Sequence, residues 1–259
     1  MPRFSANLSF LWPDLEPCDR IKAAADAGFK KVEILFPYEW DVDRIERDLQ
    51  RCDLDLVLFD VPPGDREKGE RGMLCIPGRE EECLAAVRRA LELARRFGTR
   101  RLNLLAGMLP PDLPREQALA HAATVLRKAG DLAQAAGVQL LIENISPPTA
   151  PGYLAETVEQ AAELIAAANH AAIALQLDQY HVSMVGADPS AAAECYASAI
   201  GHVQIADVPG RHQPGSGTAP ITAFLAKLDE LGYDGSVGLE YAPLGSMDEA
   251  LAWLPLNKR

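Results

Sequence analysis

Leu140-Leu141-Ile142-Glu143-Asn144 is a short apolar run that ends on a carboxylate followed by an amide. Three later stretches have the same form: Ala174-Leu175-Gln176-Leu177-Asp178, His202-Val203-Gln204-Ile205-Ala206-Asp207 and Val237-Gly238-Leu239-Glu240-Tyr241. Each run is too short for an ordinary helix and predicts a buried strand. The polar residues that end or interrupt these runs (Glu143, Asp178, Gln204 and Glu240) therefore gather where strands end.

The rest of the chain alternates short apolar runs with amphipathic stretches, which is typical of βα units around a parallel sheet. Four earlier strands are predicted at 4–10, 31–36, 54–59 and 101–106, and helices at 17–28, 42–52, 80–97, 115–136, 157–169, 189–200, 222–231 and 247–254. Eight such units in 259 residues fit a (β/α)8 barrel, which typically has roughly 250 residues. We predict an α/β fold, a single (β/α)8 TIM barrel domain over 1–259. A doubly wound sheet is the alternative, but no glycine-rich fingerprint follows the first strand.

Composition narrows the classes of partner. The formal net charge of −12 argues against binding to nucleic acid or to an acidic membrane, because the nonspecific attraction has the wrong sign. The five cysteines are scattered without metal-ligand spacing and predict reduced thiols. No apolar run has the length of a membrane span, and the first residues do not resemble a signal peptide. We expect a cytoplasmic protein that binds a small molecule; a homo-oligomer remains open.

The barrel prediction gives the strand-end residues a meaning, because active sites in this fold lie at the carboxyl ends of the strands. Glu143, Asp178, Gln204 and Glu240 come from four consecutive strands and can point to one spot. Three carboxylates placed there would repel one another unless a cation lies among them. Carboxylate and amide oxygens suit Mg²⁺ or Mn²⁺ better than Zn²⁺. The alternative is that lysines, backbone N–H groups or water hold these acids.

Several longer motifs resemble the hydroxypyruvate isomerase group of the xylose isomerase-like barrels. They are Arg3-Phe4-Ser5-Ala6-Asn7-Leu8-Ser9, Val32-Glu33, Phe36-Pro37-Tyr38, Pro63-Gly64-Asp65, Gly69-Glu70-Arg71-Gly72, Ile76-Pro77-Gly78-Arg79-Glu80, Leu177-Asp178, Tyr180-His181, the run 202–207, Arg211, Pro214-Gly215 with Gly217, and Gly238 with Glu240-Tyr241. The resemblance implies a metal held by Glu143, Asp178, Gln204 and Glu240. It also implies isomerisation of hydroxypyruvate to 2-hydroxy-3-oxopropanoate through an enediolate, with Glu143 and Glu240 as the acid and base.

Further residues are candidates for contacts around this centre. His181 resembles a histidine that contacts substrate oxygens in related enzymes, and Arg211 can pair with a substrate carboxylate in a fork geometry. Glu70 and Asn7 are further candidates for substrate binding. His202 and Asp207 are candidates for orienting the metal ligands. The segment 61–78, rich in Gly and Pro, is too long for an ordinary connection. We predict that it is a lid.

Departures from the family pattern leave the substrate open. The chain has Ala242 where relatives usually have lysine, Thr218-Ala219-Pro220-Ile221 in a differing loop, and Asp60 where asparagine is usual. An isomerase or epimerase of a longer acid or sugar, such as 2-oxotetronate or a free ketose, is the second hypothesis. A non-catalytic barrel that binds a metabolite is the third.

Overall fold

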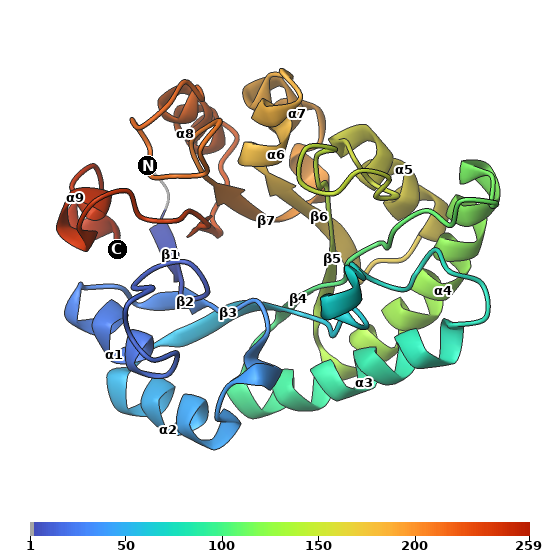
Figure 1. The fold of residues 1–259 in the computed structure, drawn as a ribbon, viewed down its shortest axis with the longest axis horizontal. Helices are drawn as coiled ribbons and strands as arrows, with labels where there is room; N and C mark the ends of the chain where they lie inside the picture. Colours follow the sequence, from blue (N-terminus) through green and yellow to red (C-terminus); the bar gives the residue numbers. More distant parts are fainter. Residues whose placement is uncertain (1–2) are drawn as a thin grey trace. The chain divides into compact units, whose positions relative to one another are not determined.

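In the computed structural model, which describes residues 3–259, parallel strands close into a barrel in chain order from β1 to β8. Helices follow the strands along the chain, as the colour sequence of Figure 1 shows. The predicted (β/α)8 architecture is confirmed and the doubly wound alternative is wrong, because β8 pairs with β1 and leaves no open edge. The carboxyl ends of the strands therefore lie at one end of the barrel.

The elements have the following bounds. The strands are β1 (Arg3–Asn7), β2 (Lys31–Glu33), β3 (Asp55–Asp60), β4 (Arg101–Asn103), β5 (Gln139–Glu143), β6 (Ile173–Asp178), β7 (Ile200–Ile205) and β8 (Ser236–Leu239). The α-helices are α1 (Asp19–Asp26), α2 (Val42–Cys52), α3 (Glu80–Phe97), α4 (Arg115–Ala136), α5 (Val158–Ala168), α6 (Gln179–Met184), α7 (Pro189–Cys195), α8 (Ile221–Glu230) and α9 (Met247–Leu251). Short 3₁₀ helices are η1 (Pro37–Glu39), η2 (Arg66–Lys68), η3 (Ala197–Ala199) and η4 (Leu256–Lys258).

Local sequence accounts for most of these boundaries. Asp41 and Thr157 accept hydrogen bonds from the backbone N–H groups three residues later and so begin α2 and α5. The helix predicted from 189 to 200 ends instead at Cys195, and η3 follows it. Helix α6 was not predicted. The N-cap residue that marks the start of α6 is Asp178, which is also the last residue of β6. No separate cap residue therefore indicates this helix in the sequence.

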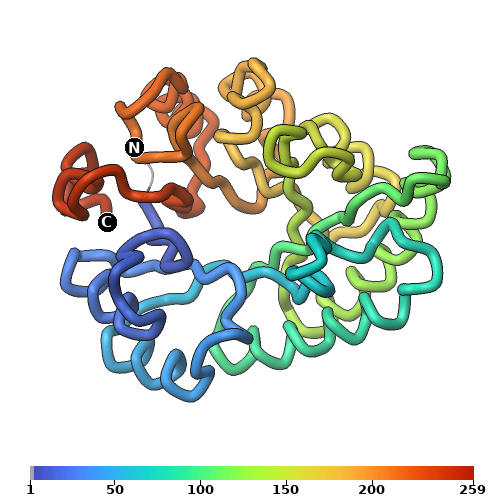
Figure 2. The backbone as a smooth tube through the Cα atoms, viewed as in Figure 1, coloured from blue at the N-terminus to red at the C-terminus, as the bar shows by residue number. Residues whose placement is uncertain are grey.

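The chain divides into two compact units. The first contains the residues up to Phe59 together with Asp178–Ala197 and His202–Arg259. In this unit the C-terminal segment lies beside α1 (Figure 2), where Arg259 Nη1 donates to the carbonyl of Ala27 at 3.1 Å. The ring of Trp253 meets Phe4 edge-on at 5.4 Å. These contacts join the two ends of the described chain.

The second unit contains Asp60–Leu177 and Ser198–Gly201. Its helices α3 and α4 pack along each other (Figure 1). The interior of β5 consists of Leu140, Leu141 and Ile142, which are fully buried. Burial of such a run stabilises the strand by about 1.5–3 kcal/mol per side chain. The run ends on Glu143, so the same strand that builds the core delivers a carboxylate to its carboxyl end.

The predicted lid segment 61–78 is more closely anchored than the sequence indicates. Met73, Leu74 and Cys75 are buried, and Gly72 forms a backbone bridge with Ala106. A Cβ on Gly72 would lie 1.9 Å from the carbonyl oxygen of Leu105. Residues 72–75 are thus part of the core of the second unit. A lid remains a proposal for the part before Gly72.

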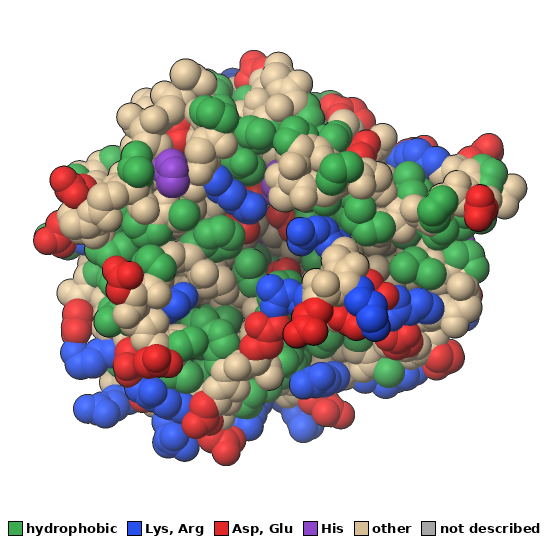
Figure 3. Space-filling model, in the orientation of Figure 1, with side chains coloured by type: hydrophobic (Ala, Val, Ile, Leu, Met, Phe, Trp, Pro, Cys, Tyr) green, Lys and Arg blue, Asp and Glu red, His purple; other side chains and the backbone are tan. Residues whose placement is uncertain are grey.

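Acidic and basic side chains are interspersed over the face in Figure 3 rather than segregated into a basic patch. All five cysteines are free thiols, as predicted. Within residues 3–259, no helix combines the length and the apolar composition that a bilayer crossing requires.

Candidate active site at the carboxyl ends of the strands

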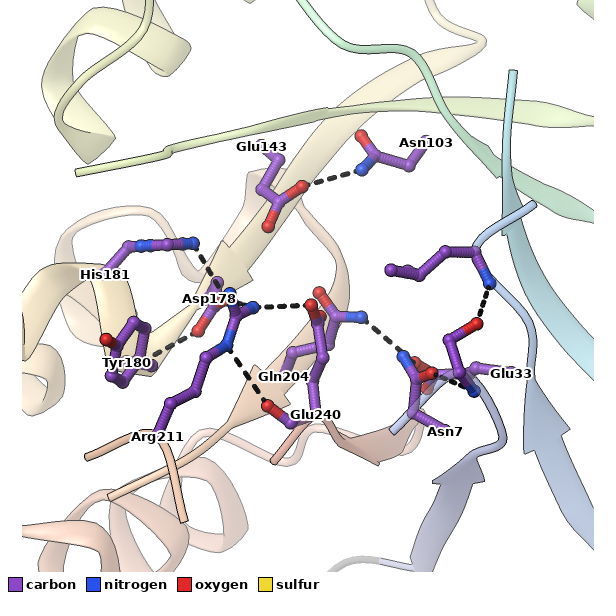
Figure 4. Close-up of polar contacts among 12 residues, drawn as sticks. Asn7, Glu33, Asn103, Glu143, Asp178, Tyr180, His181, Gln204, Arg211 and Glu240 are labelled. Atoms are coloured by element: carbon purple, nitrogen blue, oxygen red, sulfur yellow. Dashed lines mark hydrogen bonds and ion pairs between the residues drawn. The ribbon is translucent and has the colours of Figure 1, made fainter. Parts of the chain in front are cut away.

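Glu33, at the end of β2, is the centre of a buried polar cluster in the first unit (Figure 4). Its Oε1 accepts a hydrogen bond from Ser5 Oγ at 2.6 Å and lies 2.8 Å from His202 Nε2. Its Oε2 accepts from Gln204 Nε2 at 3.0 Å and from Asn7 Nδ2 at 3.4 Å. A buried carboxylate is tolerated only when it is hydrogen-bonded in this way. Because the Gln204 amide turns Nε2 to Glu33, its carbonyl oxygen faces away from Glu33.

The closeness of Glu33 to β8 explains a glycine on that strand. A Cβ on Gly238 would lie 2.4 Å from Glu33 Oε1 and 2.5 Å from Oε2. Only glycine therefore leaves room for the carboxylate in its observed position. The sequence did not indicate that Glu33 would be central, because this position depends on the pairing of β1 with β2 and β8.

Arg211 neutralises two of the predicted metal ligands in this structure (Figure 4). Its Nη2 lies 2.5 Å from Glu240 Oε1 and 3.7 Å from Asp178 Oδ2. The guanidinium also lies 5.0 Å from the ring centre of Phe10 and 4.9 Å from that of Tyr180. Such cation–π contacts restrain a planar guanidinium. Arg211 was predicted to meet a substrate carboxylate, and here it faces protein carboxylates of the same chemistry.

Asp178 and His181 are both buried. Asp178 Oδ1 accepts a hydrogen bond from Tyr180 N at 2.8 Å, and this bond caps the start of α6. The first turn of this short helix brings His181 Nε2 to 3.5 Å from Asp178 Oδ2. Burial raises the pKa of Asp178 to about 6, although the charge of Arg211 opposes this shift. Removal of the carboxylate from water disfavours its charged form. A bound cation would relieve that cost.

This raised pKa predicts how the stability of the metal-stripped protein depends on pH. Because the pKa of Asp178 rises from 3.8 to about 6 on folding, the folded state holds the proton more tightly than the unfolded state. The resulting contribution to stability is complete below about pH 4 and is lost as the pH rises through 6. Urea unfolding between pH 4 and 7 measures it. The Asp178→Asn variant should lack this component, and an identical pH slope in both proteins would contradict the shift.

Glu143 is a buried carboxylate of the second unit. Its Oε2 accepts a hydrogen bond from Asn103 Nδ2 at 2.7 Å (Figure 4). Asn103 ends β4, which pairs with β5, and so the bond joins two strand ends. Asn103 was not predicted from the sequence. The available signal was a single amide inside the apolar run 102–106.

Three buried side chains form a candidate metal-binding group: Glu143, Asp178 and His181 each offer a ligand atom, and these atoms lie within 4.8 Å of one another. Glu143 lies opposite Gln176 in the pairing of β5 with β6, and Asp178 is the last residue of β6. Two carboxylates and an imidazole are suitable donors for a divalent cation. The donor set and the burial cost at Asp178 thus fit a metal.

Other predicted residues have different surroundings. Glu240 is not a member of this group and contacts Arg211. Gln204 contacts Glu33. Asn7 and His202 also contact Glu33. Their proposed roles at a metal or substrate stay predictions.

Glu70 and Asp207 are engaged with other parts of the chain. Glu70 Oε1 pairs with Arg79 Nη1 at 2.7 Å, and its Oε2 accepts from the backbone N–H of Asp65 at 2.6 Å. Asp207, predicted to orient the metal ligands, accepts hydrogen bonds from the backbone of the loop that follows it. Substrate binding by Glu70 stays a prediction.

Comparison with known proteins gives full-length relatives. Residues 21–256 match the family model of the xylose isomerase-like TIM barrel. The chain is 37% identical to a 2-oxo-tetronate isomerase of Cupriavidus necator and 35% identical to the hydroxypyruvate isomerase of Escherichia coli, with 98% of each chain covered in both cases. The crystal structure of an AP endonuclease, family 2, from Brucella melitensis is 38% identical with a TM-score of 0.94, and the match covers 98% of both chains.

Proposed function

The chain belongs to the xylose isomerase-like TIM barrel family, in its group of hydroxypyruvate and 2-oxo-tetronate isomerases, and we propose that it is a metal-dependent isomerase that interconverts hydroxypyruvate and 2-hydroxy-3-oxopropanoate. It is thus a keto-acid or sugar isomerase of that group. The buried group of Glu143, Asp178 and His181 carries the proposal, because it offers charged ligands and a proton acceptor at the strand ends.

Isomerisation of hydroxypyruvate needs two proton transfers at adjacent carbons. A base removes a proton from the hydroxymethyl carbon, and the electrons of the C–H bond form the enediolate. An acid then delivers a proton to the former carbonyl carbon, while the hydroxyl proton passes from one oxygen to the other. We assign the base and the acid to Glu143 and Glu240. Buried carboxylates suit both roles, because a proton must be accepted and later returned.

Glu143, Asp178, Gln204 and Glu240 would hold the metal, and His181 is a further donor at this position. The bond from Gln204 Nε2 to Glu33 supports this assignment, because it leaves the amide oxygen as the group directed away from Glu33. When bound, a divalent cation acts as a Lewis acid on the carbonyl and hydroxyl oxygens. Mg²⁺ and Mn²⁺ fit the predominance of oxygen donors.

Arg211 would bind the carboxylate of the substrate. Its guanidinium already lies 2.5 Å from one carboxylate oxygen, that of Glu240, and a guanidinium fork matches a second carboxylate by the same geometry. His181 would donate to a substrate oxygen. The segment before Gly72 would close over the substrate and shield the enediolate from water.

A longer substrate is the second candidate. Ala242 supports it, because this exposed residue follows Glu240-Tyr241 directly and its backbone N–H donates to the carbonyl of Arg211 at 2.9 Å. A small side chain beside Arg211 leaves room for further hydroxymethylene groups. The substrate here would be a four-carbon acid such as 2-oxotetronate.

A substrate panel tests both candidates. Hydroxypyruvate, 2-oxotetronate and free ketoses would each be incubated with the Mn²⁺-loaded enzyme in deuterated water, and kcat/KM and deuterium incorporation would be measured. We expect deuterium at the carbon next to the carbonyl of at least one keto acid. Preference for 2-oxotetronate would favour the second candidate. The absence of incorporation from every compound would contradict catalysis and favour a metabolite-binding barrel.

A further inference from the structure

We propose that Asp207 is a positioning residue that sets the conformation of the β7–α8 loop, residues 206–220, and thereby places Arg211 at the substrate. This inference rests on the proposed role of Arg211 in binding a carboxylate. It differs from the expected role of Asp207 in orienting metal ligands.

The carboxylate of Asp207 is buried and holds the loop from both ends. Its Oδ1 accepts hydrogen bonds from Val208 N at 2.9 Å and Ala219 N at 2.8 Å. Its Oδ2 accepts from Gly215 N and Gly217 N, both at 2.9 Å. Four backbone N–H groups thus donate to one charged acceptor. Backbone N–H groups removed from water need such a partner. The chain returns on itself around this side chain.

Packing around Asp207 leaves little freedom for the loop. A Cβ on Gly217 would lie 2.0 Å from the carbonyl oxygen of Val208 and 2.9 Å from Asp207 Oδ1. The next residue, Thr218, donates its N–H to the same carbonyl at 3.0 Å. The loop therefore has one close-packed arrangement, with the carboxylate at its centre.

The backbone of Asp207 also connects directly to Arg211. Arg211 N donates to the carbonyl of Asp207 at 2.9 Å, and Asp207 N donates to the carbonyl of His212 at 2.8 Å. Arg211 has a left-handed backbone with φ of 54°, a conformation that costs a non-glycine residue roughly 1–2 kcal/mol. The bond from Ala242 N to the Arg211 carbonyl restrains it from the opposite side. The left-handed backbone of Arg211, restrained by hydrogen bonds on both sides, directs its guanidinium toward Glu240 and Asp178.

The variant Asp207→Asn tests this inference. It preserves size but puts an NH₂ group against two backbone N–H groups. We expect faster hydrogen exchange at the amides of Gly215, Gly217 and Ala219. We also expect kcat/KM for the acid substrate to fall by about 100-fold, because a displacement of roughly 1 Å has effects of this size. The matched control is Asp188→Asn, the same change at an exposed helix cap, which should alter neither readout.

A double-mutant cycle distinguishes positioning from general stability. If Asp207 acts through Arg211, the double variant Asp207→Asn, Arg211→Gln should be no slower than Arg211→Gln alone, because a shared effect is lost only once. Additive losses would overturn the proposal. Gly217→Ala disturbs the same loop without changing a charge and should reproduce the loss in kcat/KM if Asp207→Asn does not fold.

A crystal structure of Asp207→Asn provides a readout without turnover. We expect Arg211 Nη2 to leave its position 2.5 Å from Glu240 Oε1. An unchanged Arg211 would overturn the positioning role even if the isomerase assignment holds. If the wild-type protein turns over no compound of the panel, the proposed function fails while this structural test still decides how Asp207 acts on Arg211.

Discussion

Replacement of Glu240 by Gln is expected to reduce kcat by roughly 10²- to 10⁴-fold, the range for loss of a positioned acid or base. An amide has the shape of the carboxylate but can neither accept nor return the substrate proton. The variant also leaves Arg211 without the carboxylate at 2.5 Å. Steady-state kinetics on the Mn²⁺-loaded enzyme measures the loss. Glu230→Gln is the matched control, an exposed change that should stay within about twofold of wild type.

Deuterium incorporation assigns the two roles. If Glu240 removes the first proton, Glu240→Gln should stop both exchange and product formation. If Glu240 returns the second proton, the enediolate still forms, and deuterium should enter the starting keto acid without product. Glu143→Gln should then give the complementary result. Turnover within threefold of wild type in either variant would remove that residue from the acid–base pair.

Removal of divalent metal is expected to have the second large effect. A chelator should abolish turnover, and Mn²⁺ or Mg²⁺ should restore it. Binding to the folded state alone should also raise stability by about 3 kcal/mol at a free metal concentration 100-fold above Kd. Thermal unfolding with and without Mn²⁺ measures this gain independently of activity. The physical reason is that a cation offsets the cost of burying Glu143 and Asp178.

Asp178→Asn is the informative variant for metal binding. It removes one charge from the buried group and should lose most of the Mn²⁺-dependent rise in melting temperature. Glu230→Gln, which alters an exposed carboxylate paired with Lys227, should retain it. An unchanged melting temperature for the wild-type protein over millimolar Mn²⁺ and Mg²⁺, together with turnover that resists the chelator, would refute the metal site.

Several parts of the site were predictable because they follow strand periodicity. A run such as 140–143 has one polar end, and in a parallel barrel that end lies with the ends of the other strands. Glu143 and Asp178 each end such a strand. The partners that hold the side chains did not follow from this periodicity. Glu33 meets Gln204 and His202 across 171 and 169 residues of sequence.

The loops show where sequence reasoning was incomplete. The composition of segment 61–78 predicted a lid, and the burial of Met73 and Leu74 in the second unit did not follow from that composition. Asp207 was predicted to orient the metal ligands, and its contacts with four backbone N–H groups of the following loop did not follow from the sequence. Composition indicates that a segment is irregular, but backbone hydrogen bonds determine what it contacts.

The sequence by itself determined the alternation of eight strands with helices, the barrel prediction based on that count and the choice of acids at the strand ends, because apolar periodicity is a local property. Helix α6 was the exception. Only the tertiary structure decided that Glu33 orients Gln204, that Arg211 faces Glu240 and Asp178, and that Asp207 holds its own loop. These contacts depend on side-chain direction and on distances below 4 Å between residues far apart in the chain. No spacing along the sequence contains that information.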